Sequence, residues 1–160
     1  MEVVRVPEFN IYLADRPGEL AGVLEALAAA GVRVTALSVV EQTGNDVDHK
    51  GLVRLLGEPV EAVRRVCEGV TDTGAGPVME VEVLVVSLGE HAGRFREVAV
   101  KLADAKVNVR YVYQCPSPDG GTVRCVLRVE DTDKAEQVIG ELARLSEGPN
   151  TGLGGAAGAA

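Results

Sequence analysis

The stretch LADRPGELAGVLEALAAAGVRV, residues 13–34, decides the fold because a related stretch follows it later in the chain. Residues 88–109 read LGEHAGRFREVAVKLADAKVNV, and the two segments are identical at eight aligned positions, which include Gly18 and Gly93. Self-similarity at a fixed spacing indicates one supersecondary unit used twice. The function is therefore expected at the feature that both copies share, a tight glycine turn that opens a helix.

Each copy predicts a strand, a glycine turn, a helix and a second strand. Apolar and polar residues alternate over residues 9–14, which is typical of a half-buried strand. After the turn, apolar residues recur at helical spacing and predict one buried stripe: Leu20, Val23, Leu24, Leu27 and Ala28. Gly31 is placed to end this helix in a left-handed cap. The second copy predicts the same stripe at Phe95, Val98, Ala99, Leu102 and Ala103.

The remaining pattern completes two halves with the same order of elements. The sequence predicts further strands at 32–40, 51–56, 78–88, 107–115 and 123–129, and helices that start at Pro59 and after Asp131. The stripe of the last helix is predicted at Ala135, Val138, Ile139, Leu142 and Leu145. The strand 123–129 is predicted to have one polar face, and the centre of 78–88 to be buried on both faces.

This order predicts an α+β fold made of two ferredoxin-like βαββαβ repeats, with antiparallel sheets and helices on one face. We expect a first domain at residues 1–75, a second at 76–146, and a disordered Gly/Ala tail at 147–160. The second half lacks a final strand after Leu145, so the strand at 78–88 is a candidate to serve both halves. The two sheets are expected either to join or to stack.

Composition excludes several classes of function. The net charge is −8 and aromatic residues make up 3% of the chain, which argues against nucleic-acid binding. The chain shows neither a signal peptide nor an apolar run long enough to cross a membrane, so a cytoplasmic protein is expected. The three cysteines lack metal-ligand spacing and are predicted to be free, buried thiols: Cys67, Cys115 and Cys125. No metal site or cofactor is expected.

The first loop has the chemistry of an amino-acid site. The unpaired N–H groups of a helix start attract a carboxylate, and Gly18 lets a ligand approach the backbone closely. Asp15 offers a carboxylate for an ammonium group at the same place. The alternative is plain helix capping by Asp15, with Pro17 in the first turn.

The second loop keeps an acid at Glu90 and the glycine at Gly93 but has lost the proline. His91 takes the place of Arg16, and is either a solvated surface residue or a pH-sensitive ligand contact. Three further residues are open to two interpretations. Asn108 either donates to a ligand carboxylate or simply occupies a strand end, and Tyr111 and Tyr113 either pack between the halves or wall a ligand pocket.

Catalysis is not indicated. No serine lies in a nucleophile motif, no nucleophile–base pair is visible, and nucleotide-binding glycine motifs are absent from the sequence. A non-enzymatic protein is therefore expected.

The segment FNIYLADRPGELAGVLEALAAAGVRVTAL resembles the ACT domain, a small-molecule regulatory module, and SLGEHAGRFREVAVKLADAKVNVRYVY resembles a more divergent copy. The resemblance covers roughly residues 6–146. It implies a free-standing tandem ACT protein that binds a free amino acid between paired units. The implied ligand-binding residues are Asp15, Arg16, Pro17, Gly18, Glu19, Leu20, Glu90, His91, Ala92, Gly93 and Asn108, with Tyr111 as a candidate pocket wall.

Two departures from the family pattern suggest that the two sites are unequal. Arg33 stands where the pattern has an asparagine, and the second loop has no counterpart of Pro17. The leading expectation is an amino-acid-binding regulatory protein, in the form of a homodimer. The alternative is a protein–protein module that docks as a regulatory subunit on an amino-acid biosynthetic enzyme such as acetolactate synthase.

Overall fold

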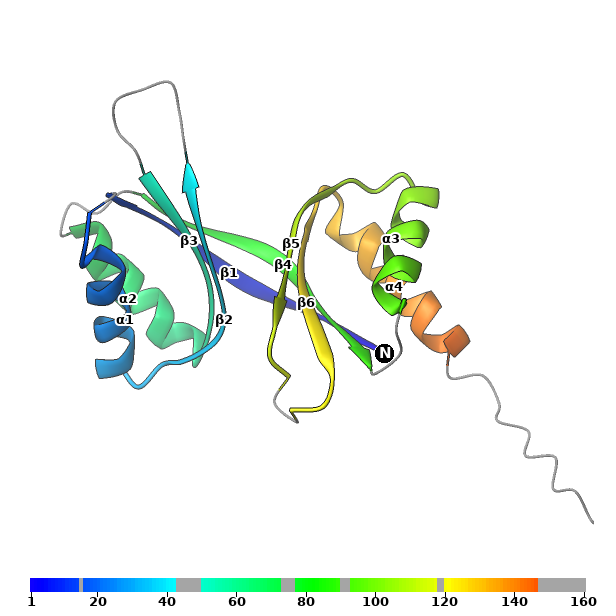
Figure 1. Ribbon diagram of the computed structural model, residues 1–160, viewed down its shortest axis with the longest axis horizontal. Helices are drawn as coiled ribbons and strands as arrows, with labels where there is room; N and C mark the ends of the chain where they lie inside the picture. The colour runs from blue at the N-terminus through cyan, green and yellow to red at the C-terminus, as the bar shows by residue number, and fades with distance from the viewer. Residues whose placement is uncertain (15, 43–49, 73–76, 90–92, 118–119, 147–160) are drawn as a thin grey trace, which may run out of the picture.

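The computed structural model describes residues 1–14, 16–42, 50–72, 77–89, 93–117 and 120–146, which form one six-stranded antiparallel sheet and four helices (Figure 1). The strands are β1 (Glu2–Ala14), β2 (Arg33–Gln42), β3 (Lys50–Glu58), β4 (Val78–Gly89), β5 (Val109–Cys115) and β6 (Val123–Val129). The helices are α1 (Glu19–Ala29), α2 (Val60–Asp72), α3 (Arg94–Asp104) and α4 (Thr132–Ser146). The expected tail at 147–160 lies outside the described residues.

The two longest strands, β1 and β4, hold the two halves together. The strand order is β2-β3-β1-β4-β6-β5, and β1 pairs with β4 from Glu2 opposite Ser87 to Ile11 opposite Val78. The strand at 78–88 therefore serves both halves, and the first part of β1 lies where the second half lacks a final strand. Of the two arrangements expected, joined or stacked sheets, the structure has the joined one. The division into two separate domains stays a prediction, because the sheet continues through both halves.

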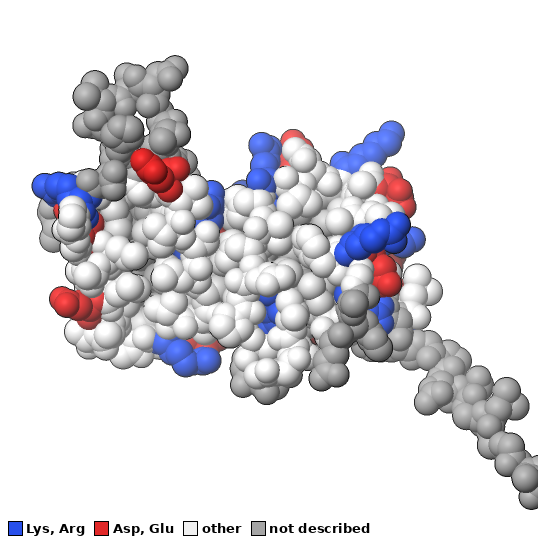
Figure 2. Space-filling model, in the orientation of Figure 1, with Lys and Arg blue, Asp and Glu red and all other residues white. Residues whose placement is uncertain are grey.

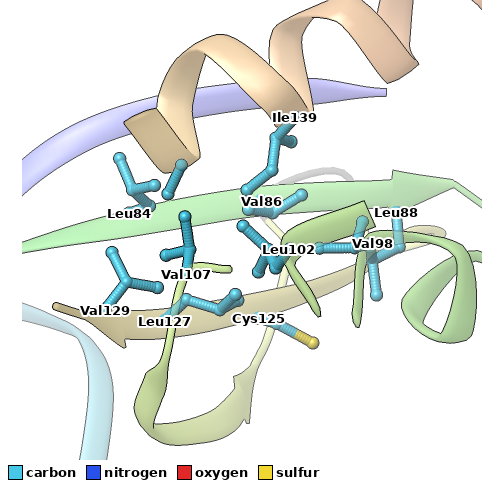
Figure 3. Close-up of a cluster of buried hydrophobic side chains, with 11 residues drawn as sticks. Leu84, Val86, Leu88, Val98, Leu102, Val107, Cys125, Leu127, Val129 and Ile139 are labelled. Carbon is cyan, nitrogen blue, oxygen red and sulfur yellow. The ribbon is translucent and has the colours of Figure 1, made fainter. Parts of the chain in front are cut away.

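Alternation along the strands places the helices on one face of the sheet. In β1, Phe9, Ile11 and Leu13 pack into a core with α1 and α2. In β4, Leu84 and Val86 pack into a second core with α3 and α4, together with Leu102 and Ile139 (Figure 3). Each end of the sheet therefore has its own helix pair, as Figure 1 shows.

The helix-free face of the sheet is folded onto itself. A third buried cluster joins residues from five different strands: Ala36, Leu56, Val83, Val85, Cys115 and Val126. The edge strands β2 and β5 contact each other, although four strands separate them in the sheet. In Figure 1, the β2–β3 and β5–β6 hairpins accordingly face each other between the two helix pairs. The centre of β4 is buried on both faces, as the sequence predicts.

Local details confirm some sequence expectations and correct others. Gly31 has φ +70°, and the N–H groups of Gly31 and Val32 donate to Ala28 and Leu27, so the helix ends in the predicted left-handed cap. Asp131 caps α4 through a 3.0 Å hydrogen bond from the Lys134 N–H. All three cysteines, which lie in the described part of the chain, are buried thiols outside any disulfide, as expected.

The predicted apolar stripes are wider than the buried ones. In α3 only Val98 and Leu102 are buried, and Phe95 is 38% exposed because only one row of the helix lies against the sheet. Leu145 is 75% exposed near the end of α4, past the residues that contact the core. The supposed polar face of β6 was also wrong in part: Val126 is fully buried, because the folded sheet covers that face.

Candidate functional site

The two glycine turns have the same backbone conformation. Gly18 and Gly93 are the N-caps of α1 and α3, with φ of 96° and 92°, a left-handed conformation that glycine adopts without strain. No side-chain hydrogen bond caps either helix in the described part of the chain. The N-cap of α1 is Gly18, and Asp15, on which the capping alternative rests, lies outside the described residues. The Glu19 N–H donates to the Arg16 carbonyl at 3.4 Å, whereas the next N–H groups of the first turn have no side-chain cap among the described residues, and the helix dipole favours an anion there.

A cavity of about 550 Å³ opens beside the start of α1, between α1 and α2. Aliphatic side chains from three elements form much of its wall: Leu13, Val23, Val66 and Val70. The space exists because small residues face it, namely Gly22 and Ala26 from α1 and Gly69 from α2. A Cβ atom added at Gly22 or Gly69 would meet no atom within 4 Å. The cavity therefore has room for an aliphatic group.

One ion pair lies where this cavity meets the helix start. The Arg16 guanidinium lies 2.6 Å from the Glu19 carboxylate, and Glu19 also lines the cavity beside Pro17 and Gly18. The pair is largely exposed on the arginine side, so it contributes little to stability and can rearrange. The Glu19 carboxylate is complementary to an α-ammonium group, and the N–H groups at the start of α1 are complementary to an α-carboxylate.

The structure brings only part of the predicted ligand set together. Pro17, Gly18 and Glu19 line the cavity, whereas Leu20 packs against the first core. Asn108 is exposed, and its carbonyl accepts a hydrogen bond from the Glu130 N–H. The predicted residues Asp15, Glu90, His91 and Ala92 lie outside the described part of the chain.

Tyr111 belongs to a different place from the glycine turns. Its hydroxyl donates to the Glu8 carboxylate on the helix-free face, and the Tyr113 hydroxyl donates to the other Glu8 oxygen at 2.8 Å. Both hydroxyls therefore contact β1 of the first half, and Tyr111 also lines a cavity on this face. The structure places neither tyrosine at a helix start, because the helices cover the opposite face of the sheet.

Glu8 is the polar residue that sequence reasoning missed. Its side chain is fully buried, and this burial raises the pKa of its carboxyl group. The hydrogen bonds from the tyrosine hydroxyls and the positive charges of Arg54 and Arg128 lower the pKa of Glu8, against the effect of burial. Burial also raises the pKa of Tyr111 to about 12, with the Glu8 carboxylate as the next cause. In the sequence Glu8 stands among alternating residues of β1 and is indistinguishable from a solvent-facing position.

In the described residues no three metal-binding side chains come together, and none of the helices there is long and apolar enough to cross a membrane.

The fold is similar to that of several solved structures. Protein BT0572 from Bacteroides thetaiotaomicron matches with a TM-score of 0.71 and 20% identity, covering 88% of this chain and 90% of that one. The ligand-free regulatory subunit of aspartate kinase from Thermus thermophilus matches with a TM-score of 0.54 and 14% identity, covering 87% and 95%. Aspartate kinase from Synechocystis matches with a TM-score of 0.56 and 14% identity, over 88% of this chain but 26% of that enzyme.

The sequence itself matches no protein-family model and no curated protein. At these identities the structural likenesses establish the fold alone. The chain has the α+β fold of aspartate kinase regulatory subunits, and this supports the resemblance to the ACT domain that its sequence motifs carry.

Proposed function

We propose that this chain is a non-enzymatic regulatory protein, built as two ACT-like repeats, that binds a free amino acid in the cavity between α1 and α2. The observation that carries the proposal is the uncapped start of α1 beside an aliphatic cavity of about 550 Å³. The likeness to aspartate kinase regulatory subunits supports a regulatory role.

The chemistry of the cavity indicates the class of amino acid. N–H groups in the first turn of α1 would hold the α-carboxylate. Glu19 would release its ion pair with Arg16 and bind the α-ammonium instead. The aliphatic wall formed by residues such as Val23 and Val70 suits a branched, apolar side chain. We therefore expect valine, leucine or isoleucine to bind more tightly than lysine or glutamate.

A thermal-shift screen against the twenty amino acids tests this proposal. A ligand at about 100 times its Kd stabilises a protein by about 2.7 kcal/mol. For a chain of this length, that corresponds to a rise in Tm of roughly 5–10 °C. A rise confined to aliphatic amino acids supports the proposal, whereas a flat screen contradicts it.

Substitutions at Gly22 identify the cavity as the site. Gly22→Leu should fill the cavity and remove the thermal shift, since Gly22 lines the cavity and a Cβ atom added there meets no atom within 4 Å. Gly22→Ala is the matched control: it should raise the unliganded Tm, because alanine favours a helix over glycine, and it should retain binding. Position 22 is preferable to Gly18, where a φ of +96° would strain any other residue. Unchanged binding in Gly22→Leu would exclude the cavity.

A docking module is the second candidate, and the edge strand β2 favours it. Its apolar side chains are unusually exposed, at Val34, Leu37, Val39 and Val40, with Val39 reaching 50%. The face in Figure 2 also carries broad areas without charged side chains. An edge strand with exposed apolar side chains can add a strand from a second copy or from a regulated enzyme. Sedimentation that shows only a monomer, combined with an amino-acid response, would disfavour this candidate.

A further inference from the structure

A second cavity, of about 560 Å³, opens on the helix-free face of the sheet. Strands β1 and β4 contribute its floor, and β3, β5 and β6 contribute its sides. We call it the arginine cleft, because its polar lining includes Arg54, Arg110 and Arg128. It lies on the opposite face of the sheet from the cavity between α1 and α2, so the two cavities can be tested independently.

The arginine cleft is positively charged in an acidic protein. Glu130 is the only carboxylate among its lining residues, against three guanidinium groups, while the chain as a whole carries a net charge of −8. Arg110 lies 3.5 Å from the Glu130 carboxylate, and Arg128 donates to the Glu82 carbonyl at 2.7 Å. Arg54 stacks over the Tyr111 ring at 4.0 Å. Three side chains of one charge held around one hollow form a site for an anion.

Two buried polar atoms at the arginine cleft lack partners among the described residues. Asn10 is 6% exposed and lines the cleft, and its Oδ1 atom accepts no hydrogen bond. The buried Nε atom of Arg54 donates none. An unsatisfied buried polar group is costly and is rare in folded proteins, so each needs an explanation. The two atoms are complementary, because one requires a donor and the other requires an acceptor.

We propose that the arginine cleft binds a small dicarboxylate that carries a hydroxyl or ammonium group next to one carboxylate. The two carboxylates pair with the guanidinium groups of Arg54, Arg110 and Arg128, and one of them accepts the Arg54 Nε–H. The adjacent hydroxyl or ammonium group donates to Asn10 Oδ1. A ligand with this pair of groups satisfies both unpaired atoms at once, which a simple dicarboxylate such as succinate, with no donor when ionised, cannot do.

Titration calorimetry with four probes tests the inference on the full chain: L-malate, L-aspartate, succinate and inorganic phosphate. Malate or aspartate should bind at least about tenfold more tightly than succinate, because succinate leaves Asn10 Oδ1 unpaired. Malate and aspartate distinguish the hydroxyl from the ammonium as the donor. Binding of phosphate as tight as that of malate would show a general anion site and overturn the proposal, as would no binding of any probe at millimolar concentration.

Variants then assign the binding to the arginine cleft. Asn10→Leu keeps the size of the side chain but removes the acceptor, so malate should lose its advantage over succinate while the protein stays folded. Arg110→Gln should weaken both probes and reduce the dependence of binding on salt. Arg96→Gln, an exposed arginine on α3, is the control of equal charge and should leave affinity unchanged. A preference for malate that survives Asn10→Leu, or an equal loss in Arg96→Gln, would overturn the assignment.

Discussion

Tyr113→Phe should destabilise the protein, because it removes one of the two hydroxyl donors that satisfy buried Glu8. The lost hydrogen bond is 2.8 Å long, and the carboxylate oxygen that it leaves behind has no access to solvent. An unsatisfied buried acceptor of this kind costs about 2 kcal/mol. In a chain of this length the expected fall in Tm is roughly 4–8 °C.

The cost of Tyr113→Phe should depend on pH, and the sign follows from Glu8. Burial raises the pKa of Glu8 in the folded state above its value in the unfolded chain. Its contribution to the free energy of unfolding is therefore fully present below the unfolded pKa and is lost as the pH rises through the folded pKa. Removal of the Tyr113 hydroxyl raises the folded pKa further, because this hydrogen bond favours the ionised carboxylate. The loss of stability should thus be larger at about pH 8 than at about pH 4.

Urea unfolding of four proteins measures this effect: the unsubstituted chain, Tyr113→Phe, Glu8→Gln and the double variant. The Glu8→Gln background should remove the pH dependence of the Tyr113→Phe cost, because no carboxylate remains to titrate. A cost that is the same across the pH range with Glu8 present would refute the assignment of the buried carboxylate as the titrating group.

Two further predictions concern local structure. Lys106 occupies the position in the second copy that Gly31 has in the first, and its φ of +56° is strained for a residue with a side chain. Lys106→Gly should therefore raise the free energy of unfolding by about 1 kcal/mol. The control Lys101→Gly, inside α3, should lower it by a similar amount. Equal effects of the two substitutions in urea unfolding would contradict this. Burial raises the pKa of the Cys67 thiol to about 11 and raises those of Cys115 and Cys125, so a thiol reagent should react slowly with the native protein and modify three thiols after denaturation. Rapid modification of the native protein would show that these thiols are accessible.

Sequence periodicity was sufficient for most of the fold because each element has a simple pattern. The alternation in β1 and the spacing of Val23 and Leu27 in α1 report directly on which side chains face the helix-covered cores. The glycines at positions 18 and 93 marked the two helix starts, because their conformation is one that other residues avoid. Alternation, helical spacing and turn glycines depend only on neighbouring residues, so they predict the individual strands, helices and helix starts.

The helix-free face was not predictable because it depends on contacts between distant strands. Glu8 and Asn10 alternate with apolar residues in β1, as solvent-facing residues of an antiparallel sheet do. They are buried only because the sheet bends until β2 and β5 meet. The same bend converts the polar face of β6 into one side of the arginine cleft, which no pattern within a single strand reveals.

The candidate amino-acid site was predicted only in part, because it too depends on contacts between distant segments. The loop residues Pro17, Gly18 and Glu19 were identified from turn chemistry, but the cavity beside them is made by Gly22 and by α2 residues about 50 positions away, such as Gly69. A glycine in the middle of a helix signals either weak helical propensity or a need for space. Only the packing of α2 against α1 distinguishes the two.

The most direct test of the central claim is a backbone amide NMR titration of the full chain with L-valine, L-leucine and L-isoleucine. The account predicts that at least one of them shifts the amide signals of Glu19, Leu20 and Ala21 at the start of α1, together with those of Gly22 and Gly69 around the cavity. Signals from residues of the arginine cleft, such as Arg128, should stay in place. If none of the three amino acids moves the signals at the start of α1, or if the shifts fall elsewhere, the cavity between α1 and α2 is not an amino-acid site.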